Sequence, residues 1–129
     1  MSAIYPLAKE SLLNAQINLV SGTFKVALLT AAYTYSALHQ YRSSITAATI
    51  ATSGALASKT VTNGVFDAAD ITLVAVPGGF TVAALAVYLD AGSAATDNLI
   101  CYINGLSLPT NGGNIPIAWD NGANKIFAL

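Results

Sequence analysis

The sequence predicts a mostly β fold, an antiparallel β-sandwich or a jelly-roll-like barrel with one short N-terminal helix. Roughly seven or eight short segments have strand-like patterns, and clusters of turn residues separate them at intervals of about a dozen residues. Only one segment has helical spacing, and the alternation of strands with long helices that a parallel α/β fold requires is absent. The chain has 129 residues and no linker-like stretch. Residues 1–129 are therefore expected to form a single domain.

The first expected element is a helix at residues 6–16. Pro6 suits the first turn of a helix, and Leu12 shares a narrow apolar stripe with Ala8. Residues 1–16 are expected to act as a helical N-terminal arm, because a neighbouring molecule can order a chain terminus easily.

The next four segments follow in order. Residues 23–30 alternate as a strand does, and both faces are nearly apolar, which is typical of a central strand. Residues 33–41 fit a turn or two of helix or an ordered loop, and the pattern does not decide between them. The uncharged residues 43–58 are predicted to form a strand and a loop. Residues 60–66 contain Asn63-Gly64, a strong signal for a β-hairpin turn.

Residues 71–76 and 80–89 are predicted to be two strands around a turn at Pro77-Gly78-Gly79, with the second strand central. The uncharged run of residues 71–89 approaches the length of a membrane-spanning helix. Its internal proline and glycines, with no second apolar span to support them, argue against that interpretation. The remaining predicted elements are strands at residues 99–103, 115–119 and 125–129, with turns or loops at residues 90–97, 109–114 and 120–122.

The composition is unusual in its lack of charge. Lys and Arg number 5, Asp and Glu number 6, and together they make 9% of residues, against about 25% in a typical domain. The net charge of −1 and the absence of a basic cluster argue against binding to nucleic acid or to an anionic membrane. Since 54% of residues are hydrophobic, the chain is expected to fold and to hide part of its surface against another molecule.

The sequence indicates no catalytic, cofactor-binding or metal site. His39 is the only histidine and Cys101 the only cysteine, so neither a zinc site nor a nucleophile–histidine pair has a recognisable pattern. His39 is expected to be a structural hydrogen-bonding group, and Cys101 a small buried apolar side chain. Asp67 and Asp70 could pair as acids, but Asp67 is better explained as a turn residue that accepts backbone N–H bonds.

A protein–protein interface is the functional feature that the residues favour. Tyr33, Tyr35 and Tyr41 gather in one segment, and tyrosine is enriched where proteins contact proteins. The uncharged stretch beside them lacks the charges that protect an exposed sheet edge. Residues 33–58 are therefore expected to lie against another chain, the alternative being that they pack on the domain's own core. The expected interface residues are Tyr5, Leu12, Tyr33, Tyr35, Tyr41, Ile45 and Ile50.

Several short sequence segments, spread in order over nearly the whole chain, are distinctive when taken together. They include Tyr-Thr-Tyr-Ser-Ala-Leu-His at residues 33–39 and Trp-Asp-Asn-Gly-Ala-Asn-Lys-Ile-Phe at residues 119–127, and the others lie at residues 5–13, 24–29, 51–56, 59–70 and 111–115. In content and order the series resembles a family of small proteins encoded in the structural modules of tailed phages and prophages. The resemblance implies a virion component, and it brings no catalytic motif.

Within that setting, the resemblance implies a capsid decoration (cement) protein, which is typically β-rich and trimeric and clamps neighbouring subunits of the major capsid protein. Such a chain would be made in the host cytoplasm and end on the capsid surface. The alternatives are a tail, neck or fibre-associated subunit, including a glycan-binding adhesin, and an enzyme, which the residues do not favour. An adhesin would expose Trp119 in a shallow groove, whereas we expect the final hairpin to bury it.

Overall fold

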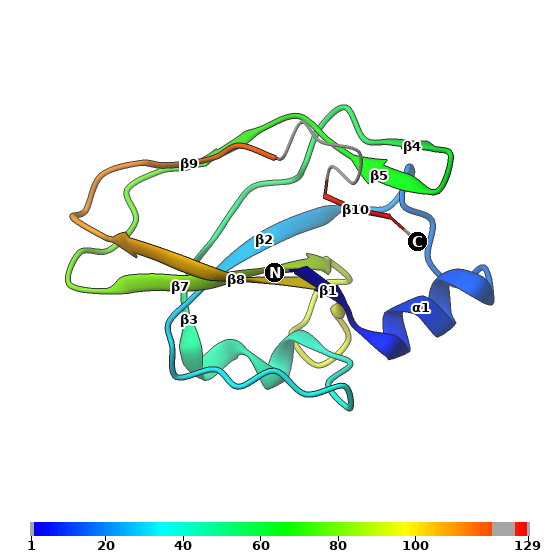
Figure 1. Cartoon of the computed structure of the whole chain (residues 1–129), viewed down its shortest axis with the longest axis horizontal. Coiled ribbons are helices and arrows are strands. Elements are labelled where there is room, and N and C mark those ends of the chain that lie inside the picture. Colours follow the sequence, from blue (N-terminus) through cyan, green and yellow to red (C-terminus); the bar gives the residue numbers. More distant parts are fainter. Residues whose placement is uncertain (1, 120–125, 129) are drawn as a thin grey trace.

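The computed structural model describes residues 2–119 and 126–128, and within them the fold is mostly β, with antiparallel sheets and one α-helix (Figure 1). The predicted fold class is therefore confirmed. The elements are β1 (Ser2–Ile4), α1 (Pro6–Leu13), β2 (Phe24–Leu29), the 3₁₀ turns η1 (Arg42–Ser44) and η2 (Thr46–Ala48), β3 (Thr49–Thr52), β4 (Thr60–Thr62), β5 (Val65–Asp67), β6 (Ile71–Leu73), β7 (Thr81–Leu89), β8 (Asn98–Pro109), β9 (Ile115–Ile117) and β10 (Phe127–Ala128).

The largest sheet has five strands in the order β1-β8-β7-β2-β3, all antiparallel. Strands β2 and β7 lie at its centre, as their apolar faces predict, and Val26 pairs with Val87, which pairs with Cys101. Every residue of β2 except the half-buried Lys25 is buried. Both faces of this sheet must therefore be covered by other parts of the chain.

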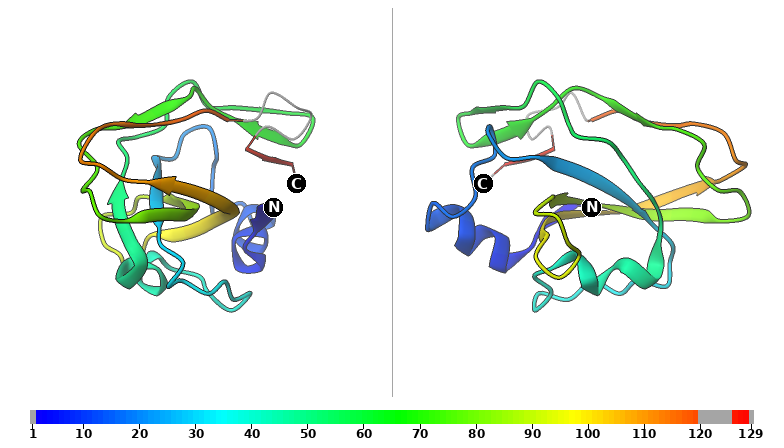
Figure 2. Two further views of the ribbon diagram at one scale, coloured as in Figure 1. Left: turned by 60° about the vertical axis from the view of Figure 1, so that its left-hand side comes forward. Right: turned by 180° about the vertical axis from the view of Figure 1, so that it is seen from behind.

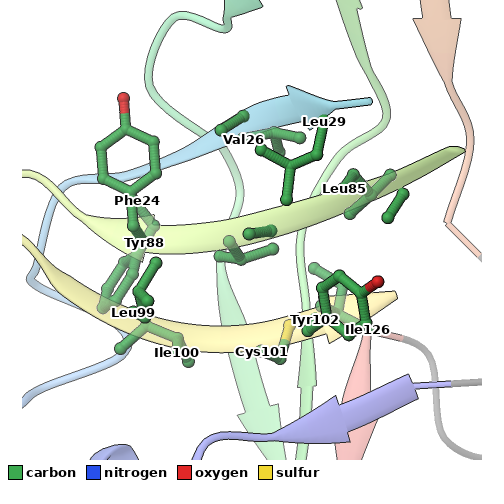
Figure 3. Close-up of a cluster of buried hydrophobic side chains, with 14 of the residues drawn as sticks. Phe24, Val26, Leu29, Leu85, Tyr88, Leu99, Ile100, Cys101, Tyr102 and Ile126 are labelled. Atoms are coloured by element: carbon green, nitrogen blue, oxygen red, sulfur yellow. The ribbon is translucent and has the colours of Figure 1, made fainter. Parts of the chain in front are cut away.

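Two smaller sheets, β10-β5-β4 and β6-β9, cover one face of the main sheet (Figures 1 and 2). The core between the layers is built on aromatic contacts: the rings of Phe24 and Phe66 lie 5.8 Å apart, and those of Phe66 and Phe127 lie 5.3 Å apart. Figure 3 shows the apolar side chains that β2, β7 and β8 contribute to the buried cluster. The opposite face is covered by α1 and by the segment that carries η1 and η2.

The helix is shorter than predicted, because the chain leaves the helical conformation at Asn14. Ala15 adopts a left-handed conformation with φ of 59°, and the Gln16 N–H donates to the Ser11 carbonyl at 2.9 Å, which closes the last turn. Residues 2–13 do not form a free arm, since β1 pairs with β8 and Ala8 is buried. The expected reaching arm is therefore part of the chain's own fold.

At two places, strands that are consecutive in the sequence do not pair with each other. The two strands around Pro77-Gly78-Gly79 do not pair with each other, because the turn carries the chain from β6 in one layer to β7 in the other, and β6 pairs with β9. The last two strands do not form a hairpin either, since β10 pairs with β5. The turn expected at residues 120–122 lies outside the described residues.

The Asn63-Gly64 hairpin is confirmed. It joins β4 to β5, with Thr62 paired to Val65. Asn63 and Gly64 have φ values of 53° and 78°, the left-handed pair that a two-residue hairpin turn requires.

Gly22 is needed because the backbone turns tightly before β2. A Cβ atom there would lie 2.8 Å from the Asn18 carbonyl oxygen and 2.8 Å from the Phe24 ring. We expect Gly22→Ala to lower the free energy of unfolding by about 1–3 kcal/mol through overpacking. Gly54→Ala is the matched control, because a Cβ there meets nothing within 4 Å, and its effect should stay within about 0.5 kcal/mol. Urea unfolding monitored by circular dichroism measures both, and equal effects would contradict the packing argument.

Candidate functional site

Three of the residues expected at an interface are buried within this chain. Tyr5 and Ile45 are 0% exposed and Tyr33 is 9% exposed, so none of them is free to contact another molecule. For these three the expectation of an interface is wrong, and the alternative, packing on the domain's own core, is correct. The physical reason is that the main sheet needs a cover on this face, and residues 33–48 supply it.

The tyrosines form a hydrogen-bonded cluster with His39. The hydroxyls of Tyr5 and Tyr33 lie 2.8 Å apart, and the Tyr33 hydroxyl lies 2.8 Å from Nδ1 of His39. The Tyr35 ring stacks on Tyr102 of β8 at 5.5 Å and lies 5.1 Å from the Tyr5 ring. Burial raises the pKa of the Tyr5 and Tyr33 phenols above their ordinary value. The cluster thus holds a loop on the sheet, and His39 has the structural role that the sequence predicts.

The other four expected residues keep some exposure. Leu12, Tyr35 and Ile50 are half-buried and pack against the core, and Tyr41 is 37% exposed. The most exposed apolar side chain of this region, Leu38 at 85%, was not among the expected interface residues. Most of the expected interface residues therefore belong to the layer that covers the core.

A second group of exposed apolar side chains lies at one end of the sandwich, which we call the uncharged tip (residues 74–81 and 105–115). Val74 is 74% exposed, Phe80 46% and Leu108 40%. In Figure 1 the tip is the left-hand end, where the chain enters β7 and leaves β8. None of the expected interface residues lies at the tip, although residues 71–89 and 98–119 contain no charged residue.

Hydrogen bonds hold the two segments of the tip together. The buried Thr110 ties its two segments together, since its N–H donates to the Phe80 carbonyl at 2.9 Å and its hydroxyl oxygen accepts from the Phe80 N–H at 3.0 Å. The Val76 N–H donates to the Gly113 carbonyl at 3.0 Å, and the Ala75 N–H donates to Oδ1 of Asn114 at 3.0 Å. These bonds fix the exposed apolar side chains on a rigid frame.

The charged residues lie toward the other end of the molecule. Lys25 pairs in register with Tyr88 near the end of β7, and its Nζ lies 2.8 Å from Asp90, which holds the pKa of that carboxyl below its ordinary value. Asp70 immediately precedes β6, and its Oδ1 accepts the Trp119 N–H at 2.9 Å. The other charged residues that the structure describes are Lys9 and Glu10 on α1, Arg42 and Asp97 beside the β7–β8 turn, and Lys59 and Asp67 at β4 and β5.

Several of the titratable groups are engaged in structural contacts. Cys101 is fully buried, as predicted, and burial raises the pKa of its thiol to about 12. Of the two acids considered as a pair, Asp70 accepts a backbone N–H, that of Trp119, whereas Asp67 is the last residue of β5. Within residues 2–119 and 126–128, no three His, Cys, Asp or Glu side chains gather closely enough to hold a metal ion.

Trp119 is buried, as expected, with 7% exposure, and its Nε1–H donates to the Ala69 carbonyl at 3.1 Å. Its backbone N–H and its indole N–H both bond to residues just before β6, and the turn of the expected final hairpin lies outside the described residues.

No protein-family model, curated protein or solved structure matches the chain. The resemblance to the phage structural family therefore stays a prediction. The only described α-helix has eight residues, and none of the described helices has the length and hydropathy of a membrane-spanning segment.

Asp97 is the most consequential of the acids for stability. Its side chain is 1% exposed, accepts from Nε of Arg42 at 2.7 Å and accepts the Ala91 N–H at 2.6 Å. We expect Asp97→Ala to cost about 2–4 kcal/mol, because it leaves Arg42 unpaired over the Tyr88 ring and the Ala91 N–H unsatisfied. Asp90→Ala, which removes the more exposed ion pair, should cost less. Denaturant unfolding compares the two, and an equal cost would contradict this assignment.

The buried thiol predicts a loss of stability at alkaline pH. Below pH 9 both the folded and the unfolded chain keep the Cys101 proton, whereas between pH 9 and 12 only the unfolded chain releases it. Stability is therefore full below pH 9 and falls as pH rises, by up to about 1.4 kcal/mol per pH unit from this group. In Cys101→Ala this part of the slope should disappear. The difference in the free energy of unfolding between the wild type and Cys101→Ala at pH 7 gives the cost of the cavity separately. If both proteins lose stability with the same slope between pH 9 and 12, the burial of the thiol is contradicted.

Proposed function

We propose that this chain is a non-enzymatic structural subunit of a bacteriophage virion, specifically a capsid decoration (cement) protein that stabilises the head by bridging neighbouring capsid subunits. The sequence series described above supports the virion setting, and it covers nearly the whole chain in order. In this proposal the chain acts on the capsid surface after synthesis in the host cytoplasm, and its partner is the major capsid protein.

The observation that carries the proposal is the uncharged tip. Three of the eight exposed large apolar side chains that the structure describes lie at this end, and no charged residue lies within residues 74–81 or 105–115. An exposed apolar group without charges around it tends to associate with other surfaces. A subunit that is held permanently in a larger shell has that end covered. Val74, Phe80 and Leu108 are the side chains that such a contact would bury.

The small apolar area of the tip means that firm attachment would need several linked copies of the chain to bind at once. A stable pairwise interface buries about 800 Å² on each partner, and apolar burial contributes about 25 cal/mol per Å². Three part-exposed side chains fall short of that area. A homotrimer, which the phage resemblance implies, would engage several capsid sites at once, and avidity would turn weak single contacts into a firm attachment.

The alternative is a tail, neck or fibre-associated subunit, for which the same tip would serve. A glycan-binding adhesin that stacks sugars on Trp119 has less support, since the indole is buried and its N–H is already bonded within the chain. The position of the chain on the particle separates these functions.

The experiment that tests the proposal uses purified particles of the phage that encodes the chain, with an antibody to the chain and cryo-electron microscopy. We expect the chain on the head in many copies. Its absence from particles would overturn the virion proposal, and its presence on the tail alone would select the alternative.

The same particles test the kind of interface. Because the tip carries no charge, attachment should survive 1 M NaCl, where the Debye length is about 3 Å and surface ion pairs are screened. The measurement is the amount of chain that sediments with particles at low and at high salt. Release at moderately raised salt would show that ion pairs, and not apolar contacts, hold the chain.

A further inference from the structure

Hydrogen bonds connect the loop at residues 33–41 to the N-terminal segment through three side chains in a row. The Tyr5 hydroxyl lies 2.8 Å from that of Tyr33, which lies 2.8 Å from Nδ1 of His39. Tyr5 and Tyr33 are buried, and His39 is half-buried. Tyr5 immediately precedes α1, whereas Tyr33 and His39 belong to the loop. The row therefore runs from the core to the loop.

The burial of Tyr5 fixes the order of the protons along this row. A phenol has one proton to donate, and a buried donor needs an acceptor. Among the described residues, Tyr33 is the one hydrogen-bond partner of the Tyr5 hydroxyl, so Tyr5 donates to Tyr33. The Tyr33 proton is then left for its other partner, Nδ1 of His39. His39 is therefore a neutral imidazole that carries its proton on Nε2.

A second proton on the imidazole is incompatible with this order. When both ring nitrogens are protonated, Nδ1 can only donate. Tyr33 would have to accept from His39 and donate its own proton to the Tyr5 oxygen. The Tyr5 proton would then point into the core without an acceptor, and a buried donor without a partner is destabilising. Protonation of His39 therefore opposes the closed position of the loop.

His39 is the member of the row that can change its charge near neutral pH. Imidazole is the side chain whose ordinary titration falls between about pH 5 and pH 8. Burial raises the pKa of the Tyr5 and Tyr33 phenols above their ordinary value, so both stay protonated in that range. His39 is also the single histidine of the chain, so no other imidazole responds with it.

The groups around His39 do not hold a charged imidazole in place. The aromatic neighbours of the row are the phenols of Tyr35, on the same loop, and Tyr102, on β8. None of the acids that the structure describes forms an ion pair with His39. The charged residues on the elements next to the loop are Lys9 and Glu10 of α1, and Arg42 of η1 with its partner Asp97.

We propose that Tyr5, Tyr33 and His39 form an acid-sensitive latch, which holds the loop at residues 33–41 on the main sheet while His39 is neutral and releases it when His39 takes up a proton. The release is confined to the loop, because β7 and β8 remain paired on both sides. This inference goes beyond the proposed function and does not depend on it, since it concerns contacts within one chain.

Nitrogen-15 NMR of the imidazole tests the order of the protons. Because the chain has one histidine, its ring signals need no assignment among several. At about pH 7.5 we expect Nδ1 of His39 to have the chemical shift of an unprotonated, hydrogen-bonded nitrogen and Nε2 that of a protonated one. A proton on Nδ1 at this pH would overturn the inference.

Hydrogen exchange tests the latch. The amides to follow are those of Tyr33 and His39, which donate to the carbonyls of Thr30 at 3.4 Å and Ser36 at 3.1 Å. After correction for the intrinsic effect of pH on exchange, we expect their protection to fall at least about fivefold between about pH 7.5 and about pH 5. The amides of β7 should keep their protection over the same interval.

His39→Asn is the matched control, because an amide oxygen can accept from Tyr33 and does not titrate. Its loop protection should change less than about twofold between the two pH values. Tyr33→Phe, which removes both bonds of the row, should also lose the response to acid. Thermal unfolding at neutral pH checks that both variants fold.

Two further results would overturn the latch. Unchanged loop protection in the wild type would show that the fold accepts a protonated His39. An equal loss of protection in His39→Asn would assign the acid response to another group. If His39→Asn does not fold, the wild type decides alone, since its loop protection must fall over the same pH interval in which the nitrogen signals of His39 report protonation.

Discussion

Strands β2 and β7 have apolar side chains on both faces, and this constraint accounts for most of the architecture. A strand of this kind has no face that water can cover, so each side of the main sheet needs its own layer. On one side the small sheets provide it through Phe66 and Phe127. On the other side, α1 and residues 33–48 provide it, and this requirement draws the tyrosines inward.

The tyrosines show why composition pointed to the wrong surface. Tyrosine is enriched at interfaces because one end of its ring is apolar and the other is polar, and the same property allows its burial when the hydroxyl finds a partner. Tyr5 and Tyr33 satisfy each other, and Tyr33 also reaches His39. The sequence places these residues in different segments, and only the pairing of β1 with β8 brings Tyr5 beside the loop. The local sequence does not contain that contact.

Periodicity predicted where the strands are, and it could not predict their partners. The alternation at residues 23–30 and 80–89, and the Asn63-Gly64 turn, depend on neighbours in the chain, and all three are confirmed. The pairing of β6 with β9 depends on a contact between residues more than forty positions apart. The turn at Pro77-Gly78-Gly79 has the composition of a hairpin, yet it carries the chain between two layers, because β7 is already paired on both sides.

The uncharged tip follows from how the few charges are used. The ion pairs at the end of β7 hold the β7–β8 turn and the loop at Arg42, so little charge remains for the rest of the surface. The tip is held instead by hydrogen bonds of Thr110 and Asn114, which fix its two loops without introducing an ion. Covering such an end removes no charge from water, and its rigid frame loses little conformational entropy. Attachment through this end, as the proposed virion role would use it, would therefore rest on apolar burial and not on ion pairs.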